Sequence, residues 1–182
     1  MVFDIYTLVE AIWLVLPAYS ANGLAPLVAL RKNLHPMDGG RKLRGQPLLG
    51  LGKSWEGFIF GTLMGGLIGF VEMLAYPYLP FGISPVPLNI VSMSPLLGLL
   101  LGFGAMFGDV AGSFIKRRLK LERGKPAPIL DQLDFLAGAL AFSLLLVSLE
   151  WGWVILLAVI TPIIHVAANV IGYLLKVKKQ PW

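Results

Sequence analysis

The sequence of 182 residues contains no cysteine and few charged residues. Without cysteine, a small secreted domain held together by disulfide bonds is excluded. Charged residues make up 14% of the chain, whereas soluble domains contain about 25%. Hydrophobic residues make up 57%, which excludes both an ordinary soluble enzyme and a disordered chain. The composition therefore predicts an integral membrane protein.

Crossing a bilayer as a helix takes roughly 20 mostly apolar residues, and five stretches meet this requirement. They run from Val2 to Leu30, Trp55 to Tyr76, Pro95 to Ile115, Ile129 to Leu149 and Val154 to Leu175. Residues 150–152 predict a tight turn between the last two. No basic residue precedes the first stretch, so we expect it to be retained rather than cleaved as a signal peptide. The expected fold is one all-α transmembrane domain, residues 1–182, with five transmembrane helices.

Lysine and arginine are absent from every segment expected on one side of the membrane, namely 1–4, 77–94 and 150–152. All 15 lie in the first loop, in or just after the end of the third stretch, or after the fifth stretch. Basic loops face the cytoplasm, so we predict an outside N-terminus and a cytoplasmic C-terminus. The loops of about 31–53 and 116–128 would then form one polar, positively charged cytoplasmic pocket. Glycines in the first of these loops allow its backbone N–H groups to approach a phosphate.

Glycine recurs every four residues in two of the apolar stretches. The second stretch has glycine at 57, 61, 65 and 69, and the third at 104, 108 and 112. Small residues in this rhythm let two helices pack closely. We expect the two rows to bring the second and third helices together.

Three aspartates lie where a membrane penalises charge. Asp109 is near the cytoplasmic end of the third stretch, and Asp131 and Asp134 open the fourth on one helix face. Asp109 could simply pair with Lys116, and Asp131 could cap its helix. Three carboxylates at one depth, without histidine or cysteine, instead favour a hard cation such as Mg²⁺, which is held by carboxylates and substrate phosphates.

A row of polar residues continues from Asp109 along the third stretch. Ser113, Lys116 and Lys120 follow at i+4, i+7 and i+11, which places them on one face. Lysines beside a metal could neutralise the oxygens of a polyphosphate, which predicts phosphoryl or nucleotidyl transfer at the membrane surface. A small transporter is an alternative, but it would need polar residues in both halves of the bilayer. A scaffold that binds anionic lipid would leave the aspartates without a role.

Three runs of residues carry a resemblance to a known family. They are GKSWEG at 52–57, GDVAGSFIKR at 108–117 and PILDQLD at 128–134. In this order they resemble the signature of the membrane CTP:phosphatidate cytidylyltransferases. The short chain and DGGR at 38–41 are most similar to the archaeal branch, the CDP-archaeol synthases. The resemblance covers about residues 22–138. Bacterial and eukaryotic relatives have a PGHGG-like stretch where this chain has APIL at 127–130, so no histidine base can be assigned there.

The resemblance implies a magnesium-dependent nucleotidyltransferase at the cytoplasmic face of the cell membrane. It would transfer CMP from CTP to 2,3-di-O-geranylgeranylglyceryl phosphate in membrane phospholipid biosynthesis, giving CDP-archaeol and pyrophosphate. Phosphatidic acid is the alternative lipid substrate. Membrane lipids are further partners, and nucleic acid is not expected.

The resemblance also implies roles for individual residues. The expected catalytic residues are Asp109, Lys116, Asp131 and Asp134, of which the three aspartates would hold Mg²⁺. The residues expected to bind the nucleotide and phosphates, or to order the loop around them, are Asn22, Asp38, Lys53, Ser54, Glu56, Ser113, Lys116 and Lys120.

Overall fold

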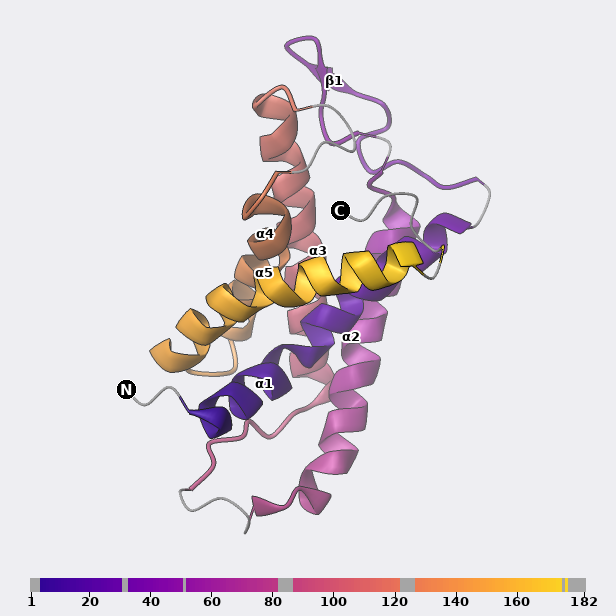
Figure 1. The fold of residues 1–182 in the computed structure, drawn as a ribbon. Coiled ribbons are helices and arrows are strands. Elements are labelled where there is room, and N and C mark those ends of the chain that lie inside the picture. Colours follow the sequence, from indigo (N-terminus) through magenta and orange to yellow (C-terminus); the bar gives the residue numbers. More distant parts are fainter. Residues whose placement is uncertain are drawn as a thin grey trace.

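Five α helices make up most of the described chain (Figure 1). A computed structural model of the protein describes residues 4–30, 33–50, 52–81, 87–121, 127–174 and 176. The helices are α1 (Ile5–Leu24), α2 (Trp55–Ala75), α3 (Pro95–Arg118), α4 (Leu130–Ser143) and α5 (Trp151–Leu174). The expectation of an all-α chain with five helices is confirmed.

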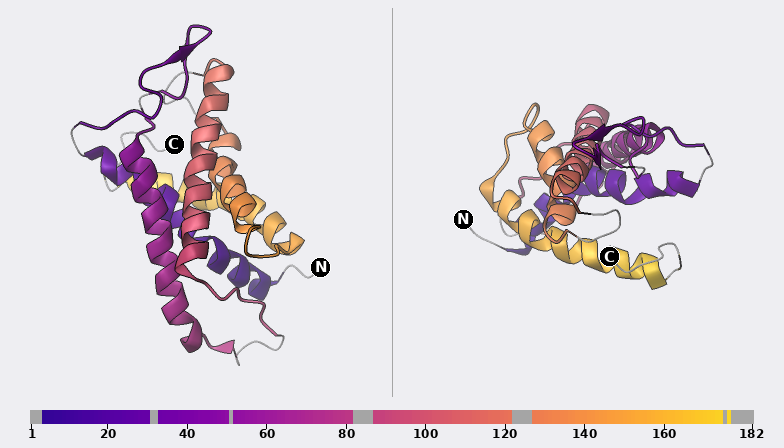
Figure 2. Two further views of the ribbon diagram at one scale, coloured as in Figure 1. Left: turned by 180° about the vertical axis from the view of Figure 1, so that it is seen from behind. Right: turned by 90° about the horizontal axis from the view of Figure 1, so that it is seen from above.

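Shorter elements extend or connect these helices. The 3-10 helices η1 (Ala25–Leu30) and η2 (Tyr76–Tyr78) continue α1 and α2. In the first loop, β1 (Lys42–Leu43) pairs antiparallel with β2 (Gln46–Pro47). The hairpin stands beside the C-terminal end of α3 in both side views (Figures 1 and 2).

Four helices in the described residues are long and apolar enough to cross a membrane, and α4 is not among them. The four segments are Ile5–Val28, Trp55–Tyr78, Pro95–Arg118 and Trp151–Leu174. α4 has 14 residues, so its length is about 21 Å, less than the roughly 30 Å of a hydrocarbon core. Residues 144–146 form a turn, and residues 147–150 have no regular secondary structure. The expected tight turn at 150–152 is therefore wrong, because α5 already begins at Trp151.

α3 packs against α2 through glycines on both helices. A Cβ atom on Gly65 of α2 would lie 2.6 Å from the Cα of Gly102, and one on Gly69 would lie 2.7 Å from the Cα of Gly98. Neither position has room for a side chain, so the backbones are in direct contact. The row in the second stretch does bring α2 and α3 together, as expected.

The other glycine row of α3 meets a different helix. A Cβ atom on Gly104 would lie 2.5 Å from the carbonyl oxygen of Gly138, and one on Gly108 would lie 2.1 Å from that of Asp134, both in α4. The expectation that Gly104, Gly108 and Gly112 face the second helix is wrong. Two rows on different sides of α3 let it contact α2 and α4 at once.

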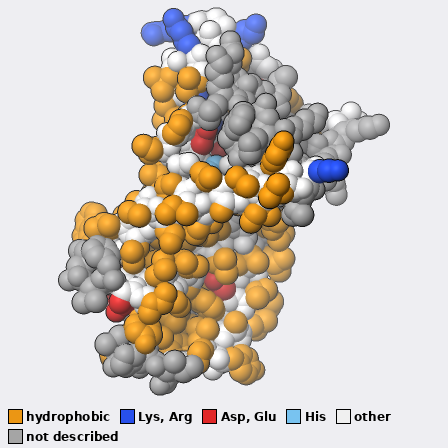
Figure 3. Space-filling view, viewed as in Figure 1, with side chains coloured by type: hydrophobic (Ala, Val, Ile, Leu, Met, Phe, Trp, Pro, Cys, Tyr) orange, Lys and Arg blue, Asp and Glu red, His pale blue; other side chains and the backbone are white. Residues whose placement is uncertain are grey.

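Apolar side chains fill the centre and also cover the outside. Leu14 of α1, Leu101 of α3, Phe135 of α4 and Leu157 of α5 belong to one buried core. α5 runs at a steep angle to α2 and α3, packs against α1 and α4, and has many exposed apolar side chains (Figures 1 and 2). On the face drawn in Figure 3, hydrophobic atoms cover the middle and lower parts, and the visible lysine and arginine atoms lie in the upper half. Exposed apolar area of this extent suits contact with lipid chains.

Candidate active site

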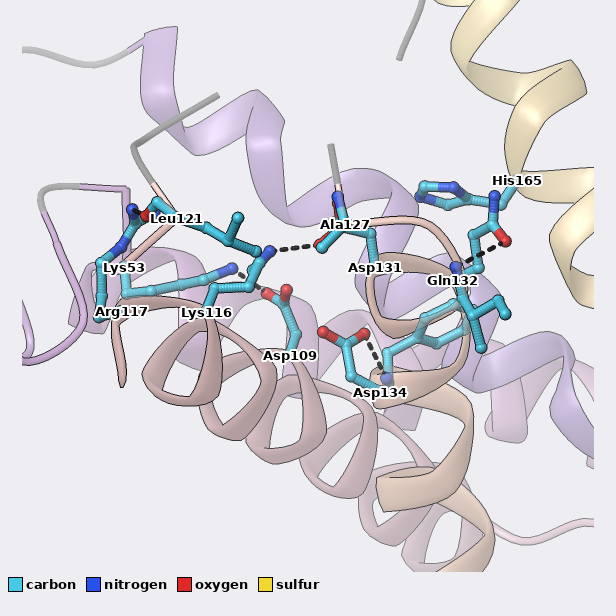
Figure 4. Close-up of polar contacts among 12 residues, drawn as sticks. Lys53, Asp109, Lys116, Arg117, Leu121, Ala127, Asp131, Gln132, Asp134 and His165 are labelled. Carbon is cyan, nitrogen blue, oxygen red and sulfur yellow. Dashed lines mark hydrogen bonds and ion pairs between the residues drawn. The ribbon is translucent and has the colours of Figure 1, made fainter. Parts of the chain in front are cut away.

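Five of the expected site residues come together where α3, the start of α4 and the first loop meet (Figure 4). Asp109 and Lys116 come from α3, Asp131 and Asp134 from α4, and Lys53 from the end of the first loop. The close contact of α3 with α4 at Gly108 and Gly112 brings Asp134 beside the helix that carries Asp109. The structure therefore brings these five side chains together, and their catalytic and binding roles stay predictions.

Two aspartates of this group are held by lysines. Lys53 Nζ donates to Asp109 Oδ2, and Lys116 Nζ donates to Asp131 Oδ1 at 2.5 Å. The Lys53 and Asp109 side chains are both 21% exposed, so solvent screens the pair only partly. The alternative pairing of Asp109 with Lys116 is wrong, because each lysine bridges from its own segment to a carboxylate on another.

Asp134 differs from the other two because no lysine among the described residues forms an ion pair with it. Its Oδ1 accepts a hydrogen bond from the backbone N of Phe135 at 2.7 Å. Its Oδ2 is buried and has no hydrogen-bond partner among the described residues. The carboxylate lies against α3 at Gly112, where a Cβ atom would be 2.0 Å from Oδ2. Gly112 thus leaves the space that the Asp134 side chain occupies.

The expected three-aspartate metal site is not assembled in this arrangement. Within the described ranges, no group of three or more His, Cys, Asp or Glu side chains could hold a metal ion. Asp131 turns toward Lys116 and toward the backbone N of Ala127, which donates to its Oδ2 at 2.8 Å. The carboxylates of Asp109 and Asp134 point toward the same space (Figure 4). One or two carboxylates suffice for Mg²⁺ when phosphates complete its ligands, so this pair fits the ion and magnesium stays a prediction.

Asp38 orders the first loop from within. Its Oδ1 accepts from the backbone N of Gly40 at 2.9 Å, and its Oδ2 accepts from those of Leu49 and Gly50, each at 3.0 Å. These bonds favour the charged form, and the one from Gly50 contributes most to holding the pKa of Asp38 below its usual value. Gly50 has a φ of 94°, which only glycine adopts readily. Of the two roles expected for Asp38, its contacts match loop ordering.

Ser54 and Glu56 also use their side chains to build the local structure. Ser54 is the N-cap of α2, and its Oγ accepts from the backbone N of Gly57 at 3.2 Å. Glu56 accepts from the backbone N of His35 at 3.0 Å and pairs with its Nδ1 at 2.5 Å. Of the two roles expected for these residues, the contacts match loop ordering, and nucleotide binding stays a prediction.

Three other expected residues lie near the ends of α1 and α3. Ser113 is buried one turn beyond Asp109. Asn22 is half-buried in the last turn of α1, and Lys120 is exposed just after α3. None of them joins the ion-paired group formed by the described residues, so their substrate contacts stay predictions.

Two arginines without an expected role reach the first loop. Arg118 donates to the carbonyl oxygens of Leu43 and Pro47, and Arg117 to that of Leu49. The acceptors lie 68–75 residues earlier in the chain. Adjacent arginines at a helix end carry no sequence signal for such distant backbone partners.

Replacing Asp38 with Asn should loosen the first loop. The lost charge-assisted hydrogen bonds are worth about 1–3 kcal/mol, so trypsin should cleave after Arg41, Lys42 and Arg44 faster at pH 7. In the unaltered protein the stabilisation is complete above the ordinary pKa of about 4 and is lost as the pH falls through the lower folded-state pKa. Limited proteolysis at pH 7 and hydrogen exchange from pH 7 to pH 3 measure both effects. Asp4→Asn, which removes the charge of the α1 N-cap but keeps an oxygen that can accept from the backbone N of Thr7, is the matched control. Equal cleavage of the unaltered protein and Asp38→Asn would contradict the role.

Comparison with known proteins identifies the family. The model for CarS-like proteins, described as CDP-archaeol synthase, matches residues 3–182. The chain belongs to the CDP-archaeol synthase family. The CDP-archaeol synthase of Thermococcus kodakarensis is 45% identical over 173 residues, which are 94% of this chain and 95% of that protein. That of Methanopyrus kandleri is 44% identical over 178 residues, covering 95% and 92%.

A solved structure supports the same family and the location in a membrane. It is that of an intramembrane enzyme for archaeal membrane lipids biosynthesis, with a TM-score of 0.73 and 39% identity. The match covers 89% of this chain and 94% of the other. Membership in the CDP-archaeol synthase family confirms the resemblance found in the motifs and favours the archaeal branch over the phosphatidate branch. It also makes the chain a multi-pass membrane enzyme rather than a transporter or a scaffold.

Proposed function

We propose that this chain transfers CMP from CTP to the phosphate of 2,3-di-O-geranylgeranylglyceryl phosphate and releases pyrophosphate. The observation that supports this most directly is the gathering of two lysines and three aspartates at one end of an apolar helix bundle. A charged nucleotide and a lipid with a charged head can meet only where such an end adjoins lipid-facing helices. The CDP-archaeol synthases among its relatives carry this activity in their name.

The reaction needs positioning and charge neutralisation more than a strong base. An oxygen of the lipid phosphate forms a bond to the α-phosphorus of CTP, and the bond from that phosphorus to the bridging oxygen of the β-phosphate breaks. The second pKa of a phosphate monoester is about 6, so the attacking group is mostly dianionic near pH 7. Holding the two anions in line and shielding their repulsion are the remaining tasks.

Lys53 and Lys116 can perform this shielding by changing partners. Each now neutralises an aspartate, and each can turn to a phosphate oxygen when CTP enters. Asp109 and Asp134 would hold Mg²⁺, which when bound supplies positive charge to the phosphates. The chain's own contribution is then two lysines that hold phosphate oxygens and two carboxylates set in place by the contact between α3 and α4.

We also propose that this site faces the cytoplasm, with the N-terminus outside. The absence of lysine and arginine from 1–4, 77–94 and 150–152 supports this orientation. CTP would reach the site from the cytoplasm, and the lipid would enter sideways between helices.

The activity test supplies purified protein with labelled CTP, Mg²⁺ and one of two lipids. We expect pyrophosphate release and a labelled lipid product with the geranylgeranyl ether lipid phosphate, and little of either when Mg²⁺ is chelated. Preference for phosphatidic acid would overturn the archaeal lipid assignment alone. Activity that persists in chelator would overturn the magnesium assignment, and no transfer with either lipid would overturn the enzyme proposal.

A further inference from the structure

The first loop is fastened to the end of α3 by a pair of arginines. Arg118 donates from Nη1 to the carbonyl oxygen of Leu43 at 2.9 Å and from Nη2 to that of Pro47 at 2.6 Å. One planar guanidinium thereby bridges both strands of the hairpin, a geometry that its fixed fork of donors allows. Arg117 adds a longer bond from Nε to the carbonyl oxygen of Leu49 at 3.4 Å.

The same loop is also tied to α3 at its other end. After the hairpin the chain passes Leu49, whose N–H is held by Asp38, and reaches Lys53, which pairs with Asp109 of α3. Arg118 and Asp109 are nine residues apart in one helix, which corresponds to about 13 Å. The described residues 43–50 and 52–53 are thus bound to α3 both at its C-terminal end and at Asp109.

The two arginines make backbone contacts rather than ion pairs. In the described residues, the salt bridges involve His35, Lys53 and Lys116 and neither arginine. Arg118 also lies over the ring of Phe114, with its Cζ 5.1 Å from the ring centroid, which holds the guanidinium in one orientation. A side chain that binds phosphate needs N–H groups that point to the substrate. In Arg118, both Nη1 and Nη2 instead donate to carbonyl groups of the loop.

We propose that Arg118, assisted by Arg117, is a positioning residue that holds the first loop closed so that Lys53 meets the phosphates of CTP. This inference rests on the proposed function for the role of Lys53. Without the arginine, the loop must be ordered when CTP binds. The apparent Kd for CTP then equals the Kd of the closed form divided by the fraction of molecules in which the loop is closed, so the affinity falls as that fraction falls. Once CTP is bound the same groups surround it, so the chemical step keeps its rate.

The decisive comparison is between Arg118→Ala and Arg118→Lys. Lysine keeps the positive charge but cannot bridge the two carbonyl oxygens. If Arg118 acts as a clamp, meaning that its bridge to Leu43 and Pro47 holds the loop, both variants should behave alike. In each we expect the KM for CTP to rise about tenfold or more, with kcat within about threefold of the unaltered protein. Hydrogen exchange of residues 38–50 should accelerate, while the melting temperature of the helical bundle stays the same. Lys42→Ala, an exposed change in the same hairpin, should leave all four quantities unchanged.

Other results would overturn the inference. If Arg118→Lys restores the KM for CTP, the charge matters and the clamp does not. A fall in kcat at unchanged KM would place Arg118 at the reacting phosphates, and a lower melting temperature would make it a general structural residue. Unchanged exchange of 38–50 in both variants would also refute the clamp. Because exchange needs no substrate, it judges the clamp even if the unaltered protein transfers no CMP, a result that counts against the proposed function instead.

Discussion

Asp134→Asn should abolish most of the CMP transfer while the helices stay folded. The substitution preserves size but removes the charge from the carboxylate whose Oδ2 is buried and has no partner among the described residues. Losing one such electrostatic group in a catalytic site costs about 10²- to 10³-fold in rate. Steady-state transfer from labelled CTP, together with circular dichroism of the purified variant, measures both parts of the expectation.

The matched control for Asp134 is Gln132→Ala in the same helix. Gln132 accepts from the backbone N of Ile129 at 3.3 Å through its side chain, so its removal affects only the start of α4. We expect activity within about threefold of the unaltered protein, because the loss of one exposed hydrogen bond is worth about 1 kcal/mol. An Asp134→Asn protein with nearly full activity would remove Asp134 from the proposed magnesium site.

Gly112→Ala should inactivate the protein through Asp134. The added Cβ would lie 2.0 Å from Oδ2 and 2.8 Å from the Cβ and Cγ of Asp134, so the carboxylate or the whole start of α4 must move. A displacement of about 1 Å in a catalytic group can cost about 10²-fold in rate. Overpacking should also lower stability by about 1–3 kcal/mol. We expect both kcat and the melting temperature to fall.

Gly69→Ala separates the two effects of Gly112→Ala. Its Cβ would meet the Cα of Gly98 at 2.7 Å, a close contact between α2 and α3 that does not involve the aspartates. We expect this variant to melt earlier while its folded fraction keeps the kcat of the unaltered protein. If Gly112→Ala behaves in the same way, Gly112 is a packing glycine and does not set the position of Asp134.

The site residues could be predicted because charge in an apolar chain is conspicuous. Asp109, Asp131, Asp134, Lys53 and Lys116 meet as expected. Their partners could not be predicted, since Lys53 and Lys116 were both free to reach more than one carboxylate. Asp109 pairs with the loop lysine because the loop folds back along α3, and that path depends on backbone contacts of Asp38, Arg117 and Arg118.

The glycine rows illustrate the same limit. Their four-residue spacing predicted close helix contacts, and such contacts exist. The spacing did not predict which helix each row contacts, because a helix face without side chains can pack closely against any neighbouring helix. The row of Gly104, Gly108 and Gly112 meets α4, and this choice brings Asp134 onto the face of α3 that carries Asp109.

The sequence alone determines a membrane protein with five helices, basic loops separated from loops without lysine or arginine, and a group of aspartates. These properties follow from transfer free energies and periodicities that are local to each stretch. The folded arrangement was needed to establish which charges pair, which glycines touch α4 and what the two arginines hold. Lys53 and Asp109 are 56 positions apart in the chain, and the arginines are still farther from the loop residues that they contact. The geometry of these contacts depends on how closely the backbones approach, which no single stretch of sequence specifies.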